Sequence, residues 1–299
     1  MTVRFATSEG GGTFHSEGLA IAGLFNRTRS DQDKCVVQTS LASIDNANLL
    51  EDSKIEFGFM ASNWIGRAKD AIAPFTRRIA LRMLSPANAG PMFFVQLARS
   101  SIKNIADLRG KRVAVGPRGS GMVEHVHTIF GVLGISFDSF TPVYLSFSEG
   151  ADALIAGDID AQFQPPIPNR VMTNLSERAE VRVIPYAPGE IAKLLSEVSF
   201  YRGITMEKGA FRGVAEDVPQ IAVVNVLVTH ERVPEETVHD MAKVIVENLD
   251  TLPQLNPLFK GLKNLFEPLR TKGAAAFEMG GVALHPGALR ALREAGWLK

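Results

Sequence analysis

The residues best placed for chemistry lie at 116–122, where a glycine-rich turn joins an apolar run to a helical pattern. Residues 112–115 are typical of a strand, and apolar residues recur at helical spacing after Gly121. Ser120 stands at the N-cap position, where its hydroxyl can accept an N–H group of the first helical turn. The remaining free N–H groups and the helix dipole favour an anion. The pattern indicates an anion-facing turn, and a turn without any ligand is the alternative.

Two better-known glycine loops differ from this turn. A phosphate-binding loop ends in Gly-Lys-Ser/Thr, whereas Met122 and Val123 follow Gly121 here. The dinucleotide fingerprint needs a third glycine, and this sequence has Glu124 at that position. The turn is therefore not predicted to bind a nucleotide.

The histidines His125 and His127 do not have the spacing of a metal site. Residues at i and i+2 point to different sides of a helix, unlike the i, i+4 pair of zinc proteases. We expect a packed or solvated role for both. Ser120 is not part of a Gly-x-Ser-x-Gly elbow, so we do not expect a nucleophilic serine. The sequence predicts a protein that is not an enzyme, with no catalytic residue, metal or cofactor.

Length and charge restrict the class of protein. A chain of 299 residues favours two globular units. Lys plus Arg and Asp plus Glu are balanced at 32 each, which argues against nucleic acid or an anionic membrane as a partner. Cys35 is the one cysteine, so neither an internal disulfide nor a cysteine-based zinc site is predicted. The apolar runs are all shorter than the roughly 20 residues of a membrane span.

The amino terminus bears on location. Residues 2–6 already predict a strand, without the charged and apolar regions of a signal peptide before them. Two interpretations remain: a protein whose signal peptide is absent from this sequence, or a protein that stays in the cytoplasm.

The elements that must position these residues alternate between strands and helices. Residues 3–26 repeat the pattern of strand, glycine turn and helix, with 8–13 as the turn, so the chain holds two candidate anion-facing turns. Further strands are predicted at 35–39, 54–60, 78–84, 92–97, 111–115, 142–146, 158–163, 181–184, 204–206 and 221–228. Further helices are predicted after Ser43 as the cap, at 148–156 and 189–198, from 234 onward, and at 286–294.

This alternation predicts an α/β protein with two mostly parallel sheets. We expect residues 1–85 and 214–299 to form a first, discontinuous lobe and residues 86–213 to form a second. Residues 86–91 are predicted as the loop of the first crossing. In open α/β sheets, ligands lie beyond the carboxyl ends of the strands. The turns after Ala6 and Val115 and the loops after Met60 and Phe163 should therefore line one ligand cleft between the lobes.

Six motifs carry a resemblance to a known family. In chain order they end at Phe14 (Gly-Gly-Thr-Phe), Asn46 (Ser-Leu-Ala-Ser-Ile-Asp-Asn), Gly121 (from Asp107), Leu154 (Leu-Ser-Phe-Ser-Glu-Gly-Ala-Asp-Ala-Leu), Pro219 (Glu-Asp-Val-Pro) and Ala288 (Leu-His-Pro-Gly-Ala). Together they span nearly the whole chain. The sequence resembles the TAXI-type solute-binding proteins of tripartite ATP-independent periplasmic (TRAP) transporters.

The resemblance implies a two-lobed periplasmic-binding-protein fold of the second type. It also implies a periplasmic protein that captures a small organic anion, a carboxylate or an amino acid such as glutamate, and delivers it to TRAP membrane permease subunits. By position it implies that the ligand-binding residues are Thr13, Phe14, Ser43, Asn63, Trp64, Ser120, Gly121, Met122 and Gln164. For Trp64, a core position is the alternative to a wall of the cleft.

The sequence departs from the family pattern at three places. The family usually continues Gly-Gly-Thr with Tyr-Tyr-Pro, whereas Phe14, His15 and Ser16 follow here. A second proline usually precedes Gly-Ser-Gly, and Arg118 replaces it, which adds a guanidinium at or near the ligand. The segment 164–168 is also unusually rich in proline. These departures bear on which ligand is bound, and an enzyme or a cytoplasmic ligand sensor on the same fold is the alternative function.

Overall fold

The structure is a computed structural model, which describes residues 2–30, 33–198 and 200–299. These residues form two compact units. Unit 1 contains the described residues before Gly11 together with 14–88 and 224–299, and unit 2 contains 11–13 and 89–223. Apart from the short segment 11–13, the chain changes unit at 88/89 and 223/224, whereas the sequence places these changes after residues 85 and 213. Each unit combines a sheet with helices, which confirms the predicted α/β class.

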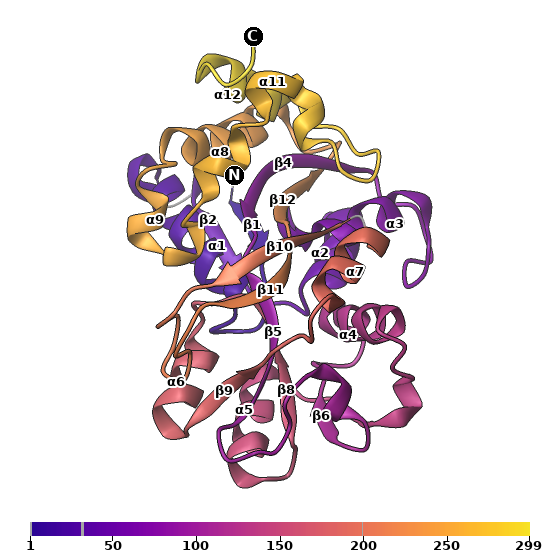
Figure 1. The fold of residues 1–299 in the computed structure, drawn as a ribbon. Coiled ribbons are helices and arrows are strands. Elements are labelled where there is room, and N and C mark those ends of the chain that lie inside the picture. Colours follow the sequence, from indigo (N-terminus) through magenta and orange to yellow (C-terminus); the bar gives the residue numbers. More distant parts are fainter. Residues whose placement is uncertain (1, 31–32, 199) are drawn as a thin grey trace. The chain divides into compact units, whose positions relative to one another are not determined.

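Unit 1 is built on a five-stranded mixed sheet (Figure 1). Its strands are β1 (Val3–Ala6), β2 (Cys35–Gln38), β3 (Phe57–Ala61), β4 (Leu81–Asn88) and β12 (Asn225–His230). Their order is β2-β1-β3-β12-β4. Strand β1 pairs in parallel with β2 and β3, and β12 runs antiparallel to β3 and β4. Strands β3 and β12 are buried along their whole length, as central strands covered on both faces should be.

The helices of unit 1 bury apolar stripes against this sheet and against one another. They are α1 (Thr13–Phe25), α2 (Ser43–Glu51), α3 (Ile65–Asp70), α8 (Glu235–Glu247), α9 (Leu252–Leu255), α10 (Leu262–Phe266), α11 (Leu269–Lys272) and α12 (Pro286–Glu294). In α8 the buried side chains Val238, Met241 and Ile245 follow helical spacing. Helices α8 and α12 pack against each other and against β4. Gly296, at φ 74°, follows the last helix, as the sequence predicts.

Unit 2 is built on a seven-stranded mixed sheet (Figure 1). Its strands are β5 (Pro91–Leu97), β6 (Arg112–Ala114), β7 (Thr141–Val143), β8 (Ala161–Gln164), β9 (Val181–Ile184), β10 (Tyr201–Met206) and β11 (Val218–Val223). The order is β10-β11-β5-β8-β6-β7, and β9 also pairs with β5. Strand β6 is parallel to β7 and β8, whereas β5 is antiparallel to β8, β9 and β11. The prediction of two mostly parallel sheets is therefore wrong, because both sheets are mixed and antiparallel pairs outnumber parallel pairs in unit 2.

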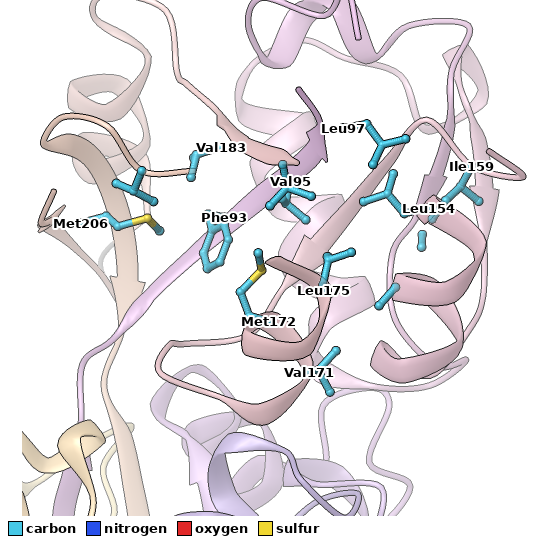
Figure 2. Close-up of a cluster of buried hydrophobic side chains, with 14 residues drawn as sticks. Phe93, Val95, Leu97, Leu154, Ile159, Val171, Met172, Leu175, Val183 and Met206 are labelled. Carbon is cyan, nitrogen blue, oxygen red and sulfur yellow. The ribbon is translucent and has the colours of Figure 1, made fainter. Parts of the chain in front are cut away.

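The helices of unit 2 each lie between two of its strands in the chain. They are α4 (Gly121–Val132), α5 (Phe147–Ala156), α6 (Arg170–Arg178) and α7 (Glu190–Glu197). Figure 2 shows Phe93 and Val95 of β5 in one cluster with Leu154 of α5 and with Met172 and Leu175 of α6. All five are buried to 99% or more. This cluster holds α5 and α6 against the sheet and so fixes the carboxyl end of β8.

The predicted strand at 221–228 is wrong, because the structure divides this run between two sheets. Residues up to Val223 belong to β11 of unit 2, and residues from Asn225 belong to β12 of unit 1. Ile221 pairs with Met92, whereas Val226 pairs with Met60. The run is apolar throughout because each half is buried in a different sheet, so its composition does not show the break.

The predicted loop at 86–91 is also wrong for most of its length. Strand β4 continues through Pro86 to Asn88, and β5 begins at Pro91. Proline lacks the N–H group that a sheet ladder needs, so it is tolerated where the pairing is irregular. The register between β4 and β12 shifts between Asn225 and Val226, and Val226 is the partner of Pro86. This irregularity lets the strand accommodate the proline.

Among the described residues, every helix is too short or too polar to cross a membrane.

Candidate functional site

The turn between β6 and α4 has the geometry that the sequence predicts, but not the predicted cap bond. Ser120 is the N-cap residue of α4, with φ −77° and ψ 155°. Its side chain is only 8% exposed, yet its Oγ has no hydrogen-bond partner among the described residues. A buried hydroxyl without a partner is costly. Together with the N–H groups that every helix start leaves free, it gives a polar site without a protein acceptor.

Gly116 allows the Ser120 hydroxyl to lie against the main chain. A Cβ atom built on Gly116 would lie 3.1 Å from both Ser120 Oγ and Met122 Cβ, and the glycine has φ +104°. A larger residue would crowd this turn and would also be strained in its backbone. The position of the hydroxyl therefore depends on a glycine here.

Gln164 at the end of β8 contributes a second buried polar atom without a partner. Gln162 Nε2 donates to the carbonyl of Phe147 at 2.8 Å, and Gln164 Nε2 donates to Gln162 Oε1 at 2.8 Å. Gln164 is fully buried, and within the described chain its Oε1 has no hydrogen-bond partner. We call Ser120 Oγ and Gln164 Oε1 the open pair.

The sheet register brings the open pair toward the same turn. Ala114 of β6 is the register partner of Gln162 in β8. Continuing this register by two residues leads from Gln164 to Gly116, the glycine that adjoins Ser120 Oγ. By this continuation of the register, the residues predicted at the second glycine turn and after Phe163 follow the ends of two neighbouring strands of unit 2.

Arg118, the residue that departs from the family pattern, lies on the outside of this turn. It is exposed, and its guanidinium carbon lies 3.9 Å from the centre of the Tyr144 ring. Gly121 and Met122 are the first residues of α4 and are half-buried. The stacking on Tyr144 gives the guanidinium a partner within unit 2.

The first glycine turn ends differently. Thr13, the first residue of α1, is buried, and its Oγ1 donates to the carbonyl of Pro166 at 3.0 Å. Both residues belong to unit 2. The Thr13 hydroxyl therefore already has a protein partner. That partner, Pro166, lies two residues after Gln164 in the chain.

In unit 1 the predicted residues gather around β3 and its carboxyl end. Phe14 stacks on Phe59 of β3, with ring centres 4.9 Å apart. Ser43 Oγ accepts the N–H group of Ala61 at 3.0 Å. The prediction that Ser43 caps α2 is wrong, because the N-cap residue is Ala42 at φ 68° and Ser43 is already helical. The hydroxyl instead ties the start of α2 to the end of β3.

Asn63 and Trp64 follow β3 in a short 3₁₀ turn, Ser62–Trp64. The Trp64 ring is fully buried. It meets Phe75 edge-on at 6.3 Å, and the guanidinium carbon of Arg67 lies 4.8 Å from its ring centre. This packing matches the core alternative for Trp64. Among the described residues, Asn63 Oδ1 and Trp64 Nε1 are buried without hydrogen-bond partners.

The two histidines of α4 pack against aromatic side chains. His125 is buried, with Nδ1 2.9 Å from the hydroxyl of Tyr201, and burial lowers the pKa of His125 to about 4. His127 stacks on Phe137 with ring centres 3.5 Å apart. His125 is thus packed, and His127 is exposed beside Phe137, within the packed or solvated roles that the sequence predicts.

A buried carboxyl group in unit 1 escapes the sequence analysis. Glu17 of α1 is fully buried, and Asn88 Nδ2 donates to both of its carboxyl oxygens at 2.8 Å. Asn225 Nδ2 in turn donates to Asn88 Oδ1 at 2.9 Å. Burial raises the pKa of Glu17 to about 8, although the hydrogen bond from Asn88 opposes this rise. One feature of the sequence could have indicated that Glu17 is buried: it lies three residues after the apolar Phe14, on the same face of the helix.

A separate depression of 480 Å³ lies near the carboxyl terminus of unit 1. Arg270, Arg293 and Trp297 are among its lining residues. Its lining contains none of the residues predicted to bind the ligand, so it is not part of the candidate site.

Three solved structures share the fold across most of both chains. A protein of Bordetella bronchiseptica RB50 is 13% identical, with a TM-score of 0.58 and coverage of 99% of this chain and 98% of that one. A structure from work on glutathione import via GshT and the cystine ABC importer TcyBC of Streptococcus mutans is 12% identical, with a TM-score of 0.55 and coverage of 87% and 95%. The alkanesulfonate-binding protein SsuA of Xanthomonas axonopodis pv. citri, bound to MOPS, is 17% identical, with a TM-score of 0.50 and coverage of 100% and 84%.

These similarities confirm the expected fold, that of type II periplasmic binding proteins. At such low identities they establish the fold alone. The sequence pattern of the NMT1-like family matches residues 5–296, almost the whole chain. The chain belongs to the NMT1-like family.

Proposed function

We propose that this chain is an extracytoplasmic solute-binding protein that captures a small organic anion and delivers it to a membrane permease. The fold supports this function, because structures that share it are named as solute-binding proteins or importer components. The proposal assigns no reaction to the site. Fold likeness does not fix function by itself, so the chemistry of the site has to carry the argument.

The observation that carries the proposal is the Ser120 hydroxyl at the start of α4. It is buried and lacks a partner among the described residues, and it adjoins the free N–H groups and the positive end of the helix dipole. A carboxylate or sulfonate would accept from both kinds of donor. Charge-assisted hydrogen bonds of this kind contribute about 1.5–3 kcal/mol each. An anionic solute therefore satisfies this turn better than a neutral one.

We further propose ligand-binding residues in each unit. From unit 2 the proposed ligand-binding residues are Thr13, Ser120, Gly121, Met122 and Gln164, and the exposed Arg118 is proposed to act on the solute through its charge. From unit 1 they are Phe14, Ser43, Asn63 and Trp64. The buried polar atoms of Asn63 and Trp64 that lack protein partners in the described chain support this second group.

The type of permease that receives the solute is a separate part of the proposal. The six sequence motifs favour a TRAP permease, and hence a TAXI-type binding protein that works in the periplasm. A similar structure, by contrast, is named with an ABC importer. Uptake of a radiolabelled ligand in cells that carry either permease type with this protein will decide between them. Uptake that needs an ABC permease would refute the TRAP assignment and leave the binding function intact.

The binding function is tested by calorimetric titration with a panel of small carboxylates, sulfonates, neutral sugars and amines. We expect one or more anions to bind, and Ser120→Ala to weaken binding about tenfold or more, as the loss of a charge-assisted bond implies. Ser146→Ala is the matched control, because Ser146 caps α5 of the same unit and its Oγ accepts the N–H of Glu149. The control should lower stability and leave affinity unchanged. Binding of neutral or cationic solutes only would refute the proposal.

A further inference from the structure

We infer that the solute bound at the α4 turn carries a hydrogen-bond donor, a hydroxyl or an ammonium group, in addition to its anionic group, and that Gln164 Oε1 accepts from this donor. The inference rests on the proposed function, because it specifies the solute class for the same site. It selects hydroxy acids and amino acids over acids that offer only acceptors.

The first step is the orientation of the two buried amides. The nitrogen and oxygen of a glutamine amide are assigned from their hydrogen bonds, and a backbone carbonyl can only accept. The carbonyl of Phe147 therefore fixes Nε2 of Gln162 as the atom that faces it, 2.8 Å away. Gln162 Oε1 must then accept, and Gln164 supplies Nε2 to it at 2.8 Å. The atom of Gln164 that remains is the oxygen, which is an acceptor.

The second step is that this chain of amides is held tightly. A Cβ atom on Gly150 of α5 would lie 2.5 Å from Gln162 Nε2, so a side chain there would collide with the amide. Gln162 is the register partner of Val95 and of Ala114, both in the apolar cluster of unit 2. A turned Gln162 would set its oxygen against the carbonyl oxygen of Phe147, and a turned Gln164 would set two amide oxygens against each other, so neither amide can turn over without an unfavourable contact between acceptors.

The third step is where the remaining oxygen lies. Gln164 is fully buried at the last position of β8, and Phe93 is its register partner in β5. On the other side, the β6 register ends at Ala114 and Gln162, and its continuation by two residues leads from Gln164 to Gly116, which adjoins Ser120 Oγ. The open pair thus combines a hydroxyl at a helix start, which suits an anion, with a fixed acceptor, which suits a donor.

The consequence for specificity follows from the cost of leaving the acceptor unsatisfied. A 2-hydroxy acid or an amino acid can satisfy both members of the open pair. A 2-oxo acid of the same size would place its own acceptor against Gln164 Oε1. Sites that use a buried polar group to recognise a ligand hydroxyl or amine reject analogues that lack it by large factors. We expect a preference of about tenfold or more.

The experiment compares matched acids by calorimetric titration on the full chain. The probes are lactate against pyruvate and 2-hydroxyglutarate against 2-oxoglutarate, with L-glutamate to separate ammonium from hydroxyl donors. The variants are Gln164→Met, which keeps the length and apolar bulk but removes the acceptor, and Gln96→Met as matched control. Gln96 is also fully buried in this sheet, with Nε2 donating to the carbonyl of Ile102 at 2.8 Å and, within the described chain, an unpartnered Oε1. Thermal unfolding checks that both variants fold.

The expected result is that wild type and Gln96→Met prefer the donor-bearing acid of a pair about tenfold, and that Gln164→Met loses the preference. If wild type binds the two acids of each pair equally, the inference is overturned while the proposed function stands. If the Gln164→Met protein keeps the preference, Gln164 is not the acceptor and the inference is likewise overturned. If wild type binds no acid of any kind, both the proposed function and the inference fail. The wild-type comparison does not depend on the folding of any variant.

Discussion

The two glycine turns of this protein have the same sequence pattern, but they differ in whether the hydroxyl at the turn has a hydrogen-bond partner in the protein. Both follow a strand and lead into a helix, α1 in one case and α4 in the other. At the first turn the Thr13 hydroxyl donates to the carbonyl of Pro166. At the second turn the Ser120 hydroxyl has no protein partner in the part of the chain that the structure describes. The difference arises from residues far away in sequence, so a turn pattern alone cannot tell a structural turn from a binding turn.

The same contrast holds for the helices that follow. The buried carboxyl of Glu17 on α1 accepts from Asn88, which accepts from Asn225. These three polar side chains are hydrogen-bonded to one another within unit 1. The start of α4 instead adjoins the open pair of unit 2. We therefore expect a change at Glu17 to alter stability and changes at the start of α4 to alter binding.

The largest expected effect is the pH dependence that Glu17 gives to stability. Its pKa is raised from 4.5 to about 8 in the folded protein, so between these pH values only the folded state holds the proton. Stability contributed by the protonated group is full below pH 4.5 and is lost as the pH rises to about 8, by up to about 5 kcal/mol. Glu17→Gln should flatten this decline in urea unfolding between pH 5 and 8.5.

An exposed acid of the same unit provides the control for this prediction. Glu247→Gln on α8 should keep the wild-type decline, because the side chain is exposed. An identical decline in Glu17→Gln and wild type would show that Glu17 does not hold the proton, and the contrast between the two helices would lose its strongest support.

The next effect in size concerns Gly116. Gly116→Ala should lower the stability of the protein by about 1–3 kcal/mol, because φ +104° strains alanine and the new methyl group would crowd Ser120 Oγ. It should also weaken anion binding by displacing the hydroxyl. Gly119→Ala separates the two causes, since Gly119 has φ +73° but no atom within 4 Å of a built Cβ. Denaturant unfolding and calorimetry measure both. Equal losses of affinity in the two variants would argue against a role for the Gly116–Ser120 contact.

A smaller effect separates the two turn hydroxyls directly. Thr13→Val keeps the side-chain shape but removes the bond to the Pro166 carbonyl, so it should cost about 1 kcal/mol of stability. Ser120→Ala removes a hydroxyl that lacks a protein partner among the described residues, so the free protein should lose little or no stability. Unfolding measured without ligand tests both. A Ser120→Ala protein that is clearly less stable than Thr13→Val would reverse the comparison.

The smallest effect is expected at Arg118. Its guanidinium is exposed and stacks on Tyr144, so it should act on an anion mainly through the surrounding field. Arg118→Gln should weaken anion binding by less than about threefold at low salt, and the difference should vanish at high salt. Titrations at two ionic strengths measure it. A loss that persists in high salt would mean that Arg118 contacts the solute directly, and would extend the binding turn beyond the open pair.

Much of the fold follows from local pattern in the sequence. Strand, turn and helix at 112–132 could be predicted because the apolar period changes from strand to helix around glycines. The position of Ser120 as N-cap is confirmed for the same reason. The break at Val224 could not be predicted, because both halves of that run are apolar and only their pairing partners differ.

The roles of individual side chains depended on contacts that local pattern does not contain. Ser43 has the residue type of a cap, yet its oxygen accepts the N–H of Ala61, 18 residues away. Glu17 is a charged residue type, which local pattern places at the surface. Its burial depends on the hydrogen bonds from Asn88, which is 71 residues away. The binding roles proposed for the predicted site residues stay predictions, because they concern a solute rather than the fold.

Cys35 is an internal chemical probe for the opening of unit 1. It is the one cysteine of the sequence, it lies on β2 at the edge of the unit 1 sheet, and it is buried. Burial raises the pKa of its thiol to about 12, so the reactive thiolate is scarce until β2 separates from β1. The rate at which an alkylating reagent modifies the native protein therefore reports how often unit 1 opens at β2. Unit 2 has no thiol, so its opening does not contribute to this rate. Solute that slows this alkylation would do so only by restraining unit 1.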